Sequence, residues 1–508
     1  MRNKRIYLIN PKNPDNFWAM QGVLDIVGKK KTLMFNSALL TLISLTPKEL
    51  NIDYVFCDEN VHSVNWNFTC DLVAITGYTL QSERIKFISA QFRAKNIPVA
   101  IGGIYATINP DDMREHADYL FIGEAEYTWP EFLRSWVRDK TQSVYKQEDH
   151  INMHDSPPPD ISYIRAKDYL YFSVQTSRGC PNNCDFCDVV RVAGRQYRSK
   201  AIPQIMKEVK NAQSMGAETV FFSDDNFCAN KQFTKELLRE LIKFNTALPR
   251  PLSFSTQATI MIGDDEELLK LFADARFSVI FIGLETLRQR CLEEVNKGQM
   301  VRYNPFDVIP RISSYGIMPF IGMIVGFDHD DKEVFREIED FLNETGSPIA
   351  SISVLNAPPN TTLYGRMKKE GRLIGEFKGF WHFSTNIIPK QITLKELYEG
   401  HQKLFKKLYE PDMFEARIKK WLKNVSYLPP FYSNQKKDLF RIFTIIKILW
   451  HFTFRVPPAN RRSFYRIIKT AWQINPRLIS RAVSLMVQYW HYYYFTHTTV
   501  WYNEEKTV

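Results

Sequence analysis

The chain has no long apolar segment and few cysteines, and both absences limit its class. It contains no uninterrupted run of about 18 apolar residues, so the sequence predicts no membrane-spanning helix. Residues 1–9 contain no apolar stretch of the length that an export signal requires. Only seven of the 508 residues are cysteine, and outside one central triplet they are scattered, unlike the disulfide framework of a secreted protein. We therefore expect a globular, cytoplasmic protein.

Acidic residues are scarce in one C-terminal segment. Residues 436–481 contain eleven Lys or Arg and a single acid, Asp438, so this segment has the same net charge, +10, as the whole chain. The remainder of the chain is close to neutral. A chain of 508 residues is too long for one hydrophobic core, and two to four domains are expected.

Three cysteines, Cys180, Cys184 and Cys187, follow the strand-like run 171–176. Their C-x3-C-x2-C spacing lets one short loop place three thiolates around a cubane iron–sulfur cluster, which leaves one of its four irons open to another molecule. A zinc site and unrelated buried thiols are the alternatives. Structural zinc takes four ligands, and no fourth Cys or His lies nearby in the sequence. The spacing therefore favours a [4Fe–4S] cluster.

Residues 1–140 alternate short apolar runs with helical patterns, which predicts an α/β domain with a parallel, doubly wound, Rossmann-like sheet. Ligands bind such sheets at the carboxyl ends of the strands. Loops with glycine follow several of these ends and would let the backbone approach a ligand closely, although ordinary turns are the alternative. The candidate cofactor-binding residues in these loops are Gly77, Gly102, Gly103, Gly123 and Glu124.

Residues 141–165 are polar, contain three consecutive prolines and predict an extended linker. Strand–helix alternation then resumes over 166–390, where six units predict an open, partial (β/α)6 barrel with active residues at the carboxyl ends of its strands. Helix caps and turns favour the same residue types, so a structural role is the alternative. The candidate cofactor-binding residues at these ends are Asp224, Asp225, Asn226, Glu285 and Gly326.

The last region, 391–508, predicts a helical extension rich in basic and aromatic residues. Apolar side chains recur at helical spacing over 439–450 and again over 464–472, among lysines and arginines. Basic amphipathic helices with aromatic residues are typical of membrane surfaces, but packing of the apolar stripe on the barrel is an equal alternative. Nucleic acid is not expected as a partner, because no nucleic-acid-binding fold accompanies the basic segment.

The cysteine motif is that of the radical S-adenosylmethionine (SAM) superfamily, and the chain resembles the cobalamin-dependent branch of that family over nearly its whole length. The resemblance implies that the open iron binds SAM, that an electron from the cluster cleaves SAM to a 5′-deoxyadenosyl radical, and that residues 1–140 bind cobalamin. The D-x-H-x-x-G signature, whose histidine ligates cobalt in many cobalamin enzymes, is missing, and this branch commonly dispenses with it. Residues 385–389 and the region after them resemble the subgroup of hopanoid methylases and bacteriochlorophyll side-chain methylases.

This resemblance implies a C-methyltransferase that acts on an unactivated carbon of an apolar, hopanoid- or tetrapyrrole-like substrate. The implied cofactors are a [4Fe–4S] cluster, SAM and cobalamin. The implied partners are an external electron donor of flavodoxin or ferredoxin type and a membrane surface, which would place the protein at the inner face of the membrane. No catalytic base is identifiable. The alternatives are a cobalamin-dependent radical SAM oxidase or cyclase and a non-catalytic, membrane-associated iron–sulfur protein.

Overall fold

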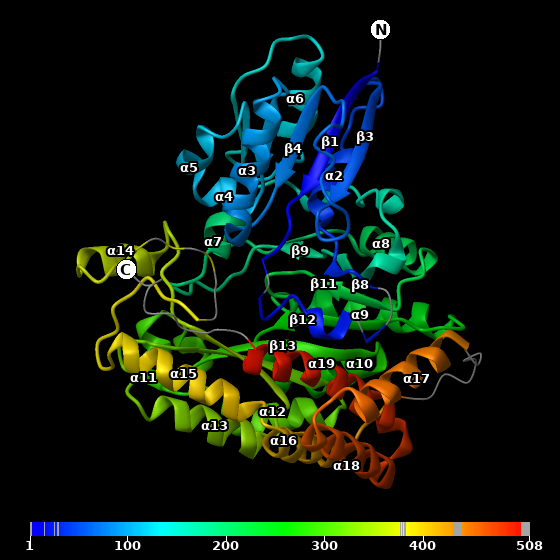
Figure 1. The fold of residues 1–508 in the computed structure, drawn as a ribbon, viewed down its shortest axis with the longest axis vertical. Helices are drawn as coiled ribbons and strands as arrows, with labels where there is room; N and C mark the ends of the chain where they lie inside the picture. Colours follow the sequence, from blue (N-terminus) through cyan, green and yellow to red (C-terminus); the bar gives the residue numbers. More distant parts are fainter. Residues whose placement is uncertain are drawn as a thin grey trace.

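The computed structural model describes residues 3–498, except 15, 25, 28–29, 376, 378, 380–382 and 430–438. Residues 436–438 of the basic segment and the last ten residues of the predicted helical extension therefore lie outside the described residues. Two parallel sheets follow one another along the long axis of the molecule, and most of the C-terminal helices lie at the far end from the first sheet (Figure 1).

The first sheet has six described strands in the order β3-β1-β4-β5-β6-β7, all parallel. Its strands alternate between two apolar cores: Tyr7 and Ile9 of β1 pack in one core, and Ile6 and Leu8 pack in the other. Helices cover both faces, as a doubly wound sheet requires. The elements are β1 (Lys4–Asn10), α2 (Ser37–Ser44), β3 (Ile52–Asp58), β4 (Leu72–Thr76), α3 (Ser82–Arg93), β5 (Val99–Gly102), α4 (Ile104–Ile108), α5 (Pro110–Arg114), β6 (Tyr119–Ile122), α6 (Thr128–Trp136) and β7 (Val144–Lys146).

The second sheet has seven described strands in the order β15-β14-β13-β12-β11-β8-β2, again all parallel, and forms the half-barrel. Its helices pack on one face, and the other face lines the inside. A two-stranded antiparallel ribbon, β9 (Ser177–Arg178) with β10 (Arg198–Ser199), frames the cysteine loop. The elements are β2 (Thr32–Met34), β8 (Tyr169–Val174), α7 (Val189–Val192), α8 (Ile202–Ser214), β11 (Thr219–Phe222), α9 (Lys231–Thr246), β12 (Ser253–Ala258), α10 (Glu266–Asp274), β13 (Phe277–Glu285), α11 (Gln289–Glu294), α12 (Pro305–Ser314), β14 (Met318–Val325), α13 (Val334–Thr345) and β15 (Ile349–Val354).

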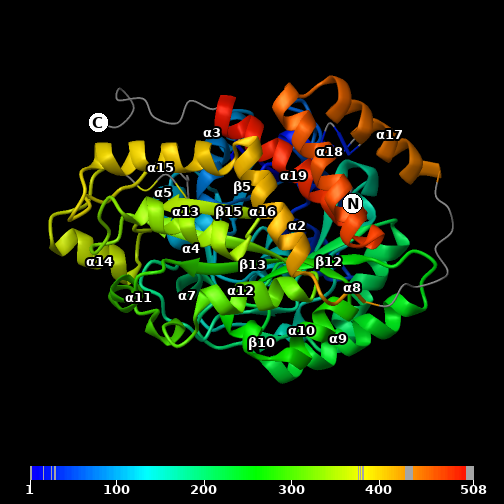
Figure 2. The ribbon, with the colours of Figure 1, turned by 90° about the horizontal axis from the view of Figure 1, so that it is seen from below.

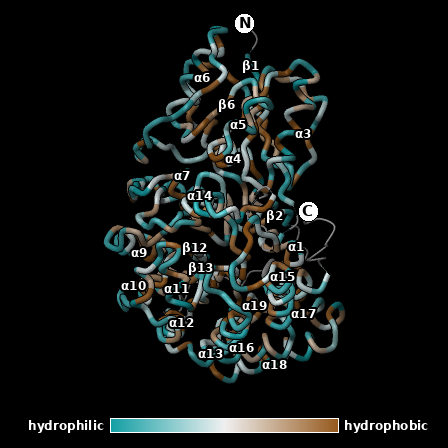
Figure 3. The backbone as a smooth tube through the Cα atoms, turned by 90° about the vertical axis from the view of Figure 1, so that its left-hand side faces the viewer, coloured by the Kyte–Doolittle hydropathy of each residue, from teal (hydrophilic) through white to brown (hydrophobic). Residues whose placement is uncertain are grey.

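The C-terminal helices extend the barrel's core (Figure 2). They are α14 (Thr362–Lys369), α15 (Leu394–Leu408), α16 (Pro411–Asn424), α17 (Leu439–Phe454), α18 (Pro458–Ile474) and α19 (Ile479–Thr498). Helix α19 packs against the short helix α1 (Gln21–Leu24), so the segment that follows β1 meets the last described helix on the barrel. Seen from the side, α13, α16 and α18 lie at the end of the molecule opposite the first sheet (Figure 3).

Two strands lie outside the domain limits that the sequence predicts. β7 lies in the predicted linker, 141–165, but pairs with β6 at the edge of the first sheet. β2 lies within residues 1–140 but pairs with β8 of the half-barrel, Thr32 beside Tyr169. Each is only three residues long, which is too short for a periodic apolar pattern to show in the sequence. The first 140 residues therefore contribute to both sheets.

Candidate functional site

The three motif cysteines lie in the loop between β9 and α7, at the carboxyl end of the half-barrel's strands. Gly179 makes the turn into this loop with a φ of +88°, and a Cβ at this position would collide with the carbonyl oxygen of Gln196. Only glycine fits there. The backbone N–H of Cys187 donates to the carbonyl of Cys184 at 3.1 Å, which curls the second half of the loop. Cys180, Cys184 and Cys187 are all half-buried.

Segments from across the half-barrel fix the cysteine loop in place. The backbone N–H of Asp185 donates to the carbonyl of Val295 at 3.0 Å, and the N–H of Leu363 donates to the carbonyl of Asp185 at 2.9 Å. The side-chain amide of Asn296 donates to the carbonyl of Asn183 at 3.0 Å. The loop is therefore held by segments that follow β13 and β15, on the opposite side of the half-barrel from the strand that leads into it.

Three thiols on one short loop are the donor set that a cubane iron–sulfur cluster takes. Burial raises the pKa of all three thiols, that of Cys184 to about 11, while the Lys297 ammonium lowers the pKa of Cys180 and Cys184. Among the described residues, no three His, Cys, Asp or Glu side chains converge as a mononuclear metal site would require. A cubane spreads its ligands over separate irons, so its thiolates stand farther apart. The cysteines as cluster ligands stay a prediction.

Asp224 lies beside this loop and is fully buried. Its Oδ1 accepts hydrogen bonds from the N–H and hydroxyl of Thr176, each at 2.9 Å, and from the N–H and hydroxyl of Ser177. Its Oδ2 is buried without a hydrogen-bond partner among the described residues. Burial raises the pKa of Asp224 to about 7. A buried carboxylate oxygen without a donor is costly, which indicates a position for a cationic or hydrogen-bonding ligand.

The two residues after Asp224 also contact the cysteine loop. Asp225 accepts a hydrogen bond from the N–H of Gly179 through Oδ2 at 2.9 Å. Asn226 lies within hydrogen-bonding reach of the Cys180 thiol, and its Oδ1 accepts from the N–H of Cys228 at 3.3 Å. The structure thus brings the predicted residues Asp224 to Asn226 together with the first cysteine.

Glu285, at the end of β13, pairs with a lysine that the sequence did not indicate. The Lys297 ammonium donates to Glu285 Oε1 at 2.5 Å and to the carbonyl of Gly283 at 2.9 Å. Glu285 has a φ of +68°, an uncommon backbone conformation for a residue with a side chain, and such strain concentrates at functional sites. The short turn around Lys297 shows no pattern in the sequence that marks it as part of a site.

Gly326 follows β14 at a tight turn beside α15. It turns with a φ of +102°, its N–H donates to Asp330 Oδ2 at 2.9 Å, and a Cβ there would meet Leu397 of α15 at 3.2 Å. The position requires glycine because of its φ and because α15 packs against it. Gly326 as a cofactor-binding residue stays a prediction.

The predicted glycines of the first sheet gather where β4, β5 and β6 end. Gly103 has a φ of +94°, and a Cβ there would collide with the hydroxyl of Thr76. Gly123 has a φ of +88°, and a Cβ there would lie 3.0 Å from the carbonyl oxygen of Gln147. The strand ends therefore approach one another as closely as backbone allows. The four residues at this edge are Gly77, Gly102, Gly103 and Gly123.

Tyr78, next to Gly77, is 52% exposed at the carboxyl edge of the first sheet. Close to this edge, the Asn360 side-chain amide donates to the carbonyl of Ile108 at 3.0 Å and joins the half-barrel to α4. The half-barrel therefore contacts the first sheet beside its carboxyl edge.

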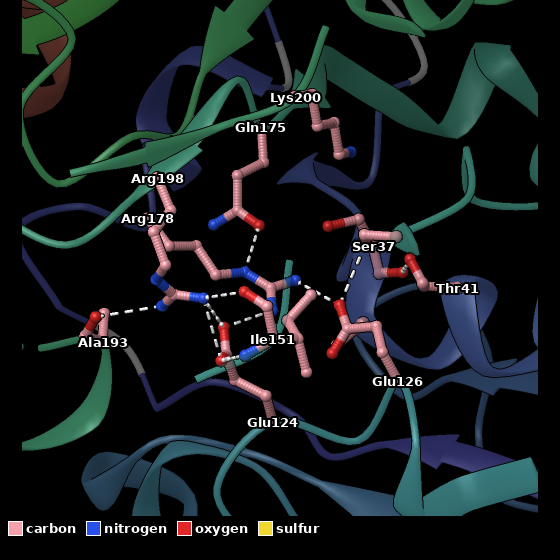
Figure 4. A network of polar contacts seen from close by, with 12 residues as sticks. Ser37, Thr41, Glu124, Glu126, Ile151, Gln175, Arg178, Ala193, Arg198 and Lys200 are labelled. Atoms are coloured by element: carbon pink, nitrogen blue, oxygen red, sulfur yellow. Dashed lines mark hydrogen bonds and ion pairs between the residues drawn. The ribbon is translucent and has the colours of Figure 1, made fainter. Parts of the chain in front are cut away.

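Glu124 joins the two sheets through a network of buried ion pairs (Figure 4). Arg178, two residues before Cys180, donates to Glu124 at 2.8 Å and to Glu126 at 2.7 Å. Arg198 donates to both oxygens of Glu124 at 3.0 Å. With both oxygens occupied in this way, Glu124 ties the β6 end to the cysteine loop, and its contact with a cofactor stays a prediction. The pairing of Glu124 and Glu126 with Arg178 and Arg198 depends on the fold and shows no pattern in the sequence.

Comparison with known proteins agrees with this geometry. The Radical SAM superfamily matches residues 174–342, and a domain of unknown function (DUF4070) matches residues 361–504. An uncharacterized methyltransferase from Synechocystis is 33% identical over 80% of this chain and 76% of its own length. The hopanoid C-2 methylase of Rhodopseudomonas palustris is 29% identical over 73% of this chain and 71% of its own. The bacteriochlorophyllide d C-12(1)-methyltransferase of Chlorobaculum tepidum is 27% identical over 74% of this chain and 84% of its own length.

A solved structure confirms the predicted fold. The radical SAM methyltransferase TsrM from Kitasatospora setae, solved with cobalamin and a [4Fe–4S] cluster bound, superposes with a TM-score of 0.62 over 93% of this chain and all of its own, at 15% identity. The predicted order of a Rossmann-like sheet, a half-barrel and a helical extension is therefore correct. Together with the relatives above, this shows that the chain belongs to the radical SAM methyltransferases and that its fold is similar to that of the cobalamin-binding TsrM.

Proposed function

We propose that this enzyme methylates an unactivated carbon of a large apolar molecule and uses a [4Fe–4S] cluster, SAM and cobalamin to do so. One observation carries the proposal. The cysteine loop and the glycine-rich edge of the first sheet meet across the buried pairs of Arg178 and Arg198 with Glu124 and Glu126. This arrangement supports two cofactor sites that face each other in one chain. When bound, the cofactors supply the radical that removes hydrogen and the methyl group that replaces it.

In this proposal the protein holds the cluster and SAM with the residues around the cysteine loop. Cys180, Cys184 and Cys187 ligate three irons. The free Oδ2 of Asp224 accepts a hydrogen bond from the SAM ammonium, which would offset the cost of burying that oxygen unpaired, about 1–3 kcal/mol. Glu285, fixed by Lys297, is the second acceptor.

The cobalamin site in this proposal is the edge of Gly77, Gly102, Gly103 and Gly123, where Tyr78 is 52% exposed. No histidine takes the place of the missing D-x-H-x-x-G ligand in the sequence, and the nearest candidate, His62, has its Nε2 2.7 Å from the Arg165 guanidinium. A ring nitrogen that accepts from arginine has its lone pair occupied. The protein would therefore hold cobalamin by shape and backbone contact.

Aromatic side chains inside the half-barrel support an apolar substrate. Phe281 of β13 and Phe320 of β14 are paired in register. Gly283 follows Phe281 by two residues, and a Cβ at Gly283 would meet Lys297. Because side chains alternate along a strand, the two rings lie on the same face as the cluster-side residues. Trp18 stacks on Phe320 at 5.2 Å and is still 40% exposed. This lining suits the polycyclic apolar substrates that the relatives' names state, hopanoids and bacteriochlorophyllides.

The electron for SAM cleavage comes, in this proposal, from an external flavodoxin- or ferredoxin-type donor. The four cysteines outside the loop form no second cluster-type spacing in the sequence. The enzyme would work in the cytoplasm at the inner face of a membrane, where apolar substrates are available.

Anaerobic reconstitution tests the cofactor assignments. The full chain, loaded with iron, sulfide and cobalamin and given a reductant, is expected to convert SAM to 5′-deoxyadenosine. Cys184→Ser should lose the cluster and this product, whereas the matched control Cys70→Ser, a buried thiol of the first sheet, should keep both. Turnover by Cys184→Ser equal to that of the unmodified chain would refute the cluster assignment.

A further inference from the structure

Helix α17 presents an apolar surface to solvent. Six of its side chains are 40–69% exposed, and four of them recur along one stripe at intervals of three or four residues. We call these six side chains the α17 face: Phe443, Ile445, Ile446, Leu449, Trp450 and Phe454. At 150–250 Å² per aromatic side chain, its three rings alone expose on the order of 350 Å². With the aliphatic side chains, this reaches the size of patch that marks an interaction site.

The opposite stripe of α17 already packs on the protein. Ile448 and Phe452 are buried, and Phe452 stacks on Phe464 of α18 at 4.3 Å with an interplanar angle of 8°. Only part of the apolar stripe that the sequence predicts therefore packs on the protein. α17 is apolar on both sides, and the α17 face is left over after packing.

Basic and aromatic residues border the α17 face. Tyr465 of α18 lies beside it, its hydroxyl 2.6 Å from that of Thr453, and Trp472 on α18 is 62% exposed. No acidic residue occurs in the sequence between Asp438 and Glu504. The exposed cations on α17, on α18 and between them are Lys447, Arg455, Arg462, Arg466 and Lys469. Arg466 also pairs with Glu415 of α16 at 3.8 Å. An apolar face with aromatic and mainly basic borders is complementary to an anionic lipid surface.

We infer that the α17 face docks this enzyme on an anionic bilayer, with the rings of α17 in the headgroup region. No helix among the described residues is long and apolar enough to cross a membrane, which fits a helix that lies in the interface. Figure 1 shows α17 at the side of the molecule, away from the first sheet. Docking through α17 therefore leaves the carboxyl edge of the first sheet uncovered.

A continuous series of contacts leads from α17 to the barrel's aromatic lining. α17 packs on α18, and α18 packs on α19 (Figure 2). Tyr492 of α19 stacks on Phe17 at 4.6 Å, and the next residue, Trp18, stacks on Phe320 inside the half-barrel. The docked side is thus the side where Phe17, Trp18 and α19 cover the barrel. The idea that an apolar substrate reaches the barrel along these contacts rests on the proposed function. The docking of the α17 face on a membrane does not.

Vesicle flotation of the cluster-loaded full chain tests the inference. We expect it to float with phosphatidylglycerol–phosphatidylcholine vesicles, less with phosphatidylcholine alone, and less at high salt. The triple variant Phe443→Ser, Trp450→Ser, Phe454→Ser should bind about tenfold more weakly or worse. A matched control, Phe87→Ser, removes a ring that is 47% exposed on α3 and should bind as the unmodified chain does.

The outcomes separate docking from catalysis. The triple variant should form 5′-deoxyadenosine at the unmodified rate, because no substituted residue lies in the proposed site. Equal flotation of the triple variant and the unmodified chain would overturn the inference. So would a concentration-dependent dimer that the triple variant abolishes without any vesicle binding, because the α17 face would then be an interface between two copies. Vesicle binding without a methylated product would instead contradict the proposed function.

Discussion

Replacement of Arg178 by glutamine should destabilise the junction between the two sheets. Arg178 is 19% exposed, and its partners Glu124 and Glu126 are 8% and 5% exposed. In Arg178→Gln, Glu124 keeps Arg198, but Glu126 loses its cationic partner and retains the Ser156 hydroxyl at 2.9 Å. The variant therefore leaves a buried carboxylate without a countercharge.

The expected cost follows from that burial. Removal of one partner of a buried ion pair costs about 3–5 kcal/mol, because the other charge stays desolvated. The matched control is Arg134→Gln, whose pair with Glu49 is 50% and 60% exposed. An exposed pair contributes below about 1 kcal/mol. Urea unfolding of the full chain, followed by circular dichroism, should separate the two variants clearly.

The loss of stability in Arg178→Gln should depend on pH. Burial by itself would raise the pKa of Glu126, but the Arg178 guanidinium holds it below its usual range. Without Arg178, burial dominates and the pKa of Glu126 in the folded variant rises above its unfolded value. A proton then stabilises the folded variant below that pKa, so the loss should be largest at pH 7 and smaller at pH 5.

Glu126→Gln in the Arg178→Gln background removes the uncompensated charge. It should recover much of the lost stability at pH 7, and the double-mutant cycle should show a coupling of more than about 1 kcal/mol. A loss in Arg178→Gln no larger than in Arg134→Gln, or independent of pH, would refute the reasoning.

Three further predictions concern single residues. Gly103→Ala should lower the free energy of unfolding in urea by about 1–3 kcal/mol and reduce bound cobalt, because the φ of Gly103 is +94°. The control Gly365→Ala, with open space around its Cβ, should not lower the free energy of unfolding. Asp224→Asn should weaken SAM binding about tenfold or more in equilibrium dialysis, since an amide N–H then faces the ammonium; unchanged affinity would exclude Asp224 from the site. Burial lowers the pKa of His401 to about 4. The neutral side chain therefore makes its full contribution to stability above pH 6.5, and the free energy of unfolding falls by about 1.4 kcal/mol per pH unit as the pH drops toward 4. His401→Asn should flatten that slope; an unchanged slope would contradict it.

Periodic apolar patterns predicted most strands of both sheets to within a few residues. The run 171–176, for example, corresponds to β8. The patterns could not assign β2 and β7, because three residues carry no period and their partners lie far away in the sequence. Parallel pairing over such separations depends on tertiary packing.

The candidate site was predictable where residue type and local spacing suffice, and less so where a partner comes from elsewhere in the chain. Asp225 contacts the cysteine loop through the N–H of Gly179, and Asp224 contacts Thr176 just before it, while their binding of a cofactor stays a prediction. Glu124 and Glu285 were recognised as polar strand ends, but their partners Arg178 and Lys297 depend on the fold. For the same reason the sequence could not decide whether α17 packs or faces solvent. Only the exposed fractions of its side chains show that it does both.

Methyl transfer itself is tested most directly by labelled SAM. The reconstituted enzyme, with cobalamin, reductant and S-(methyl-d3)-adenosylmethionine, is incubated anaerobically with a lipid extract of the source cells, and the products are analysed by mass spectrometry. We predict an apolar product that carries one trideuteromethyl group per transfer and 5′-deoxyadenosine formed alongside it. An oxidised or cyclised product that contains no label would contradict C-methylation.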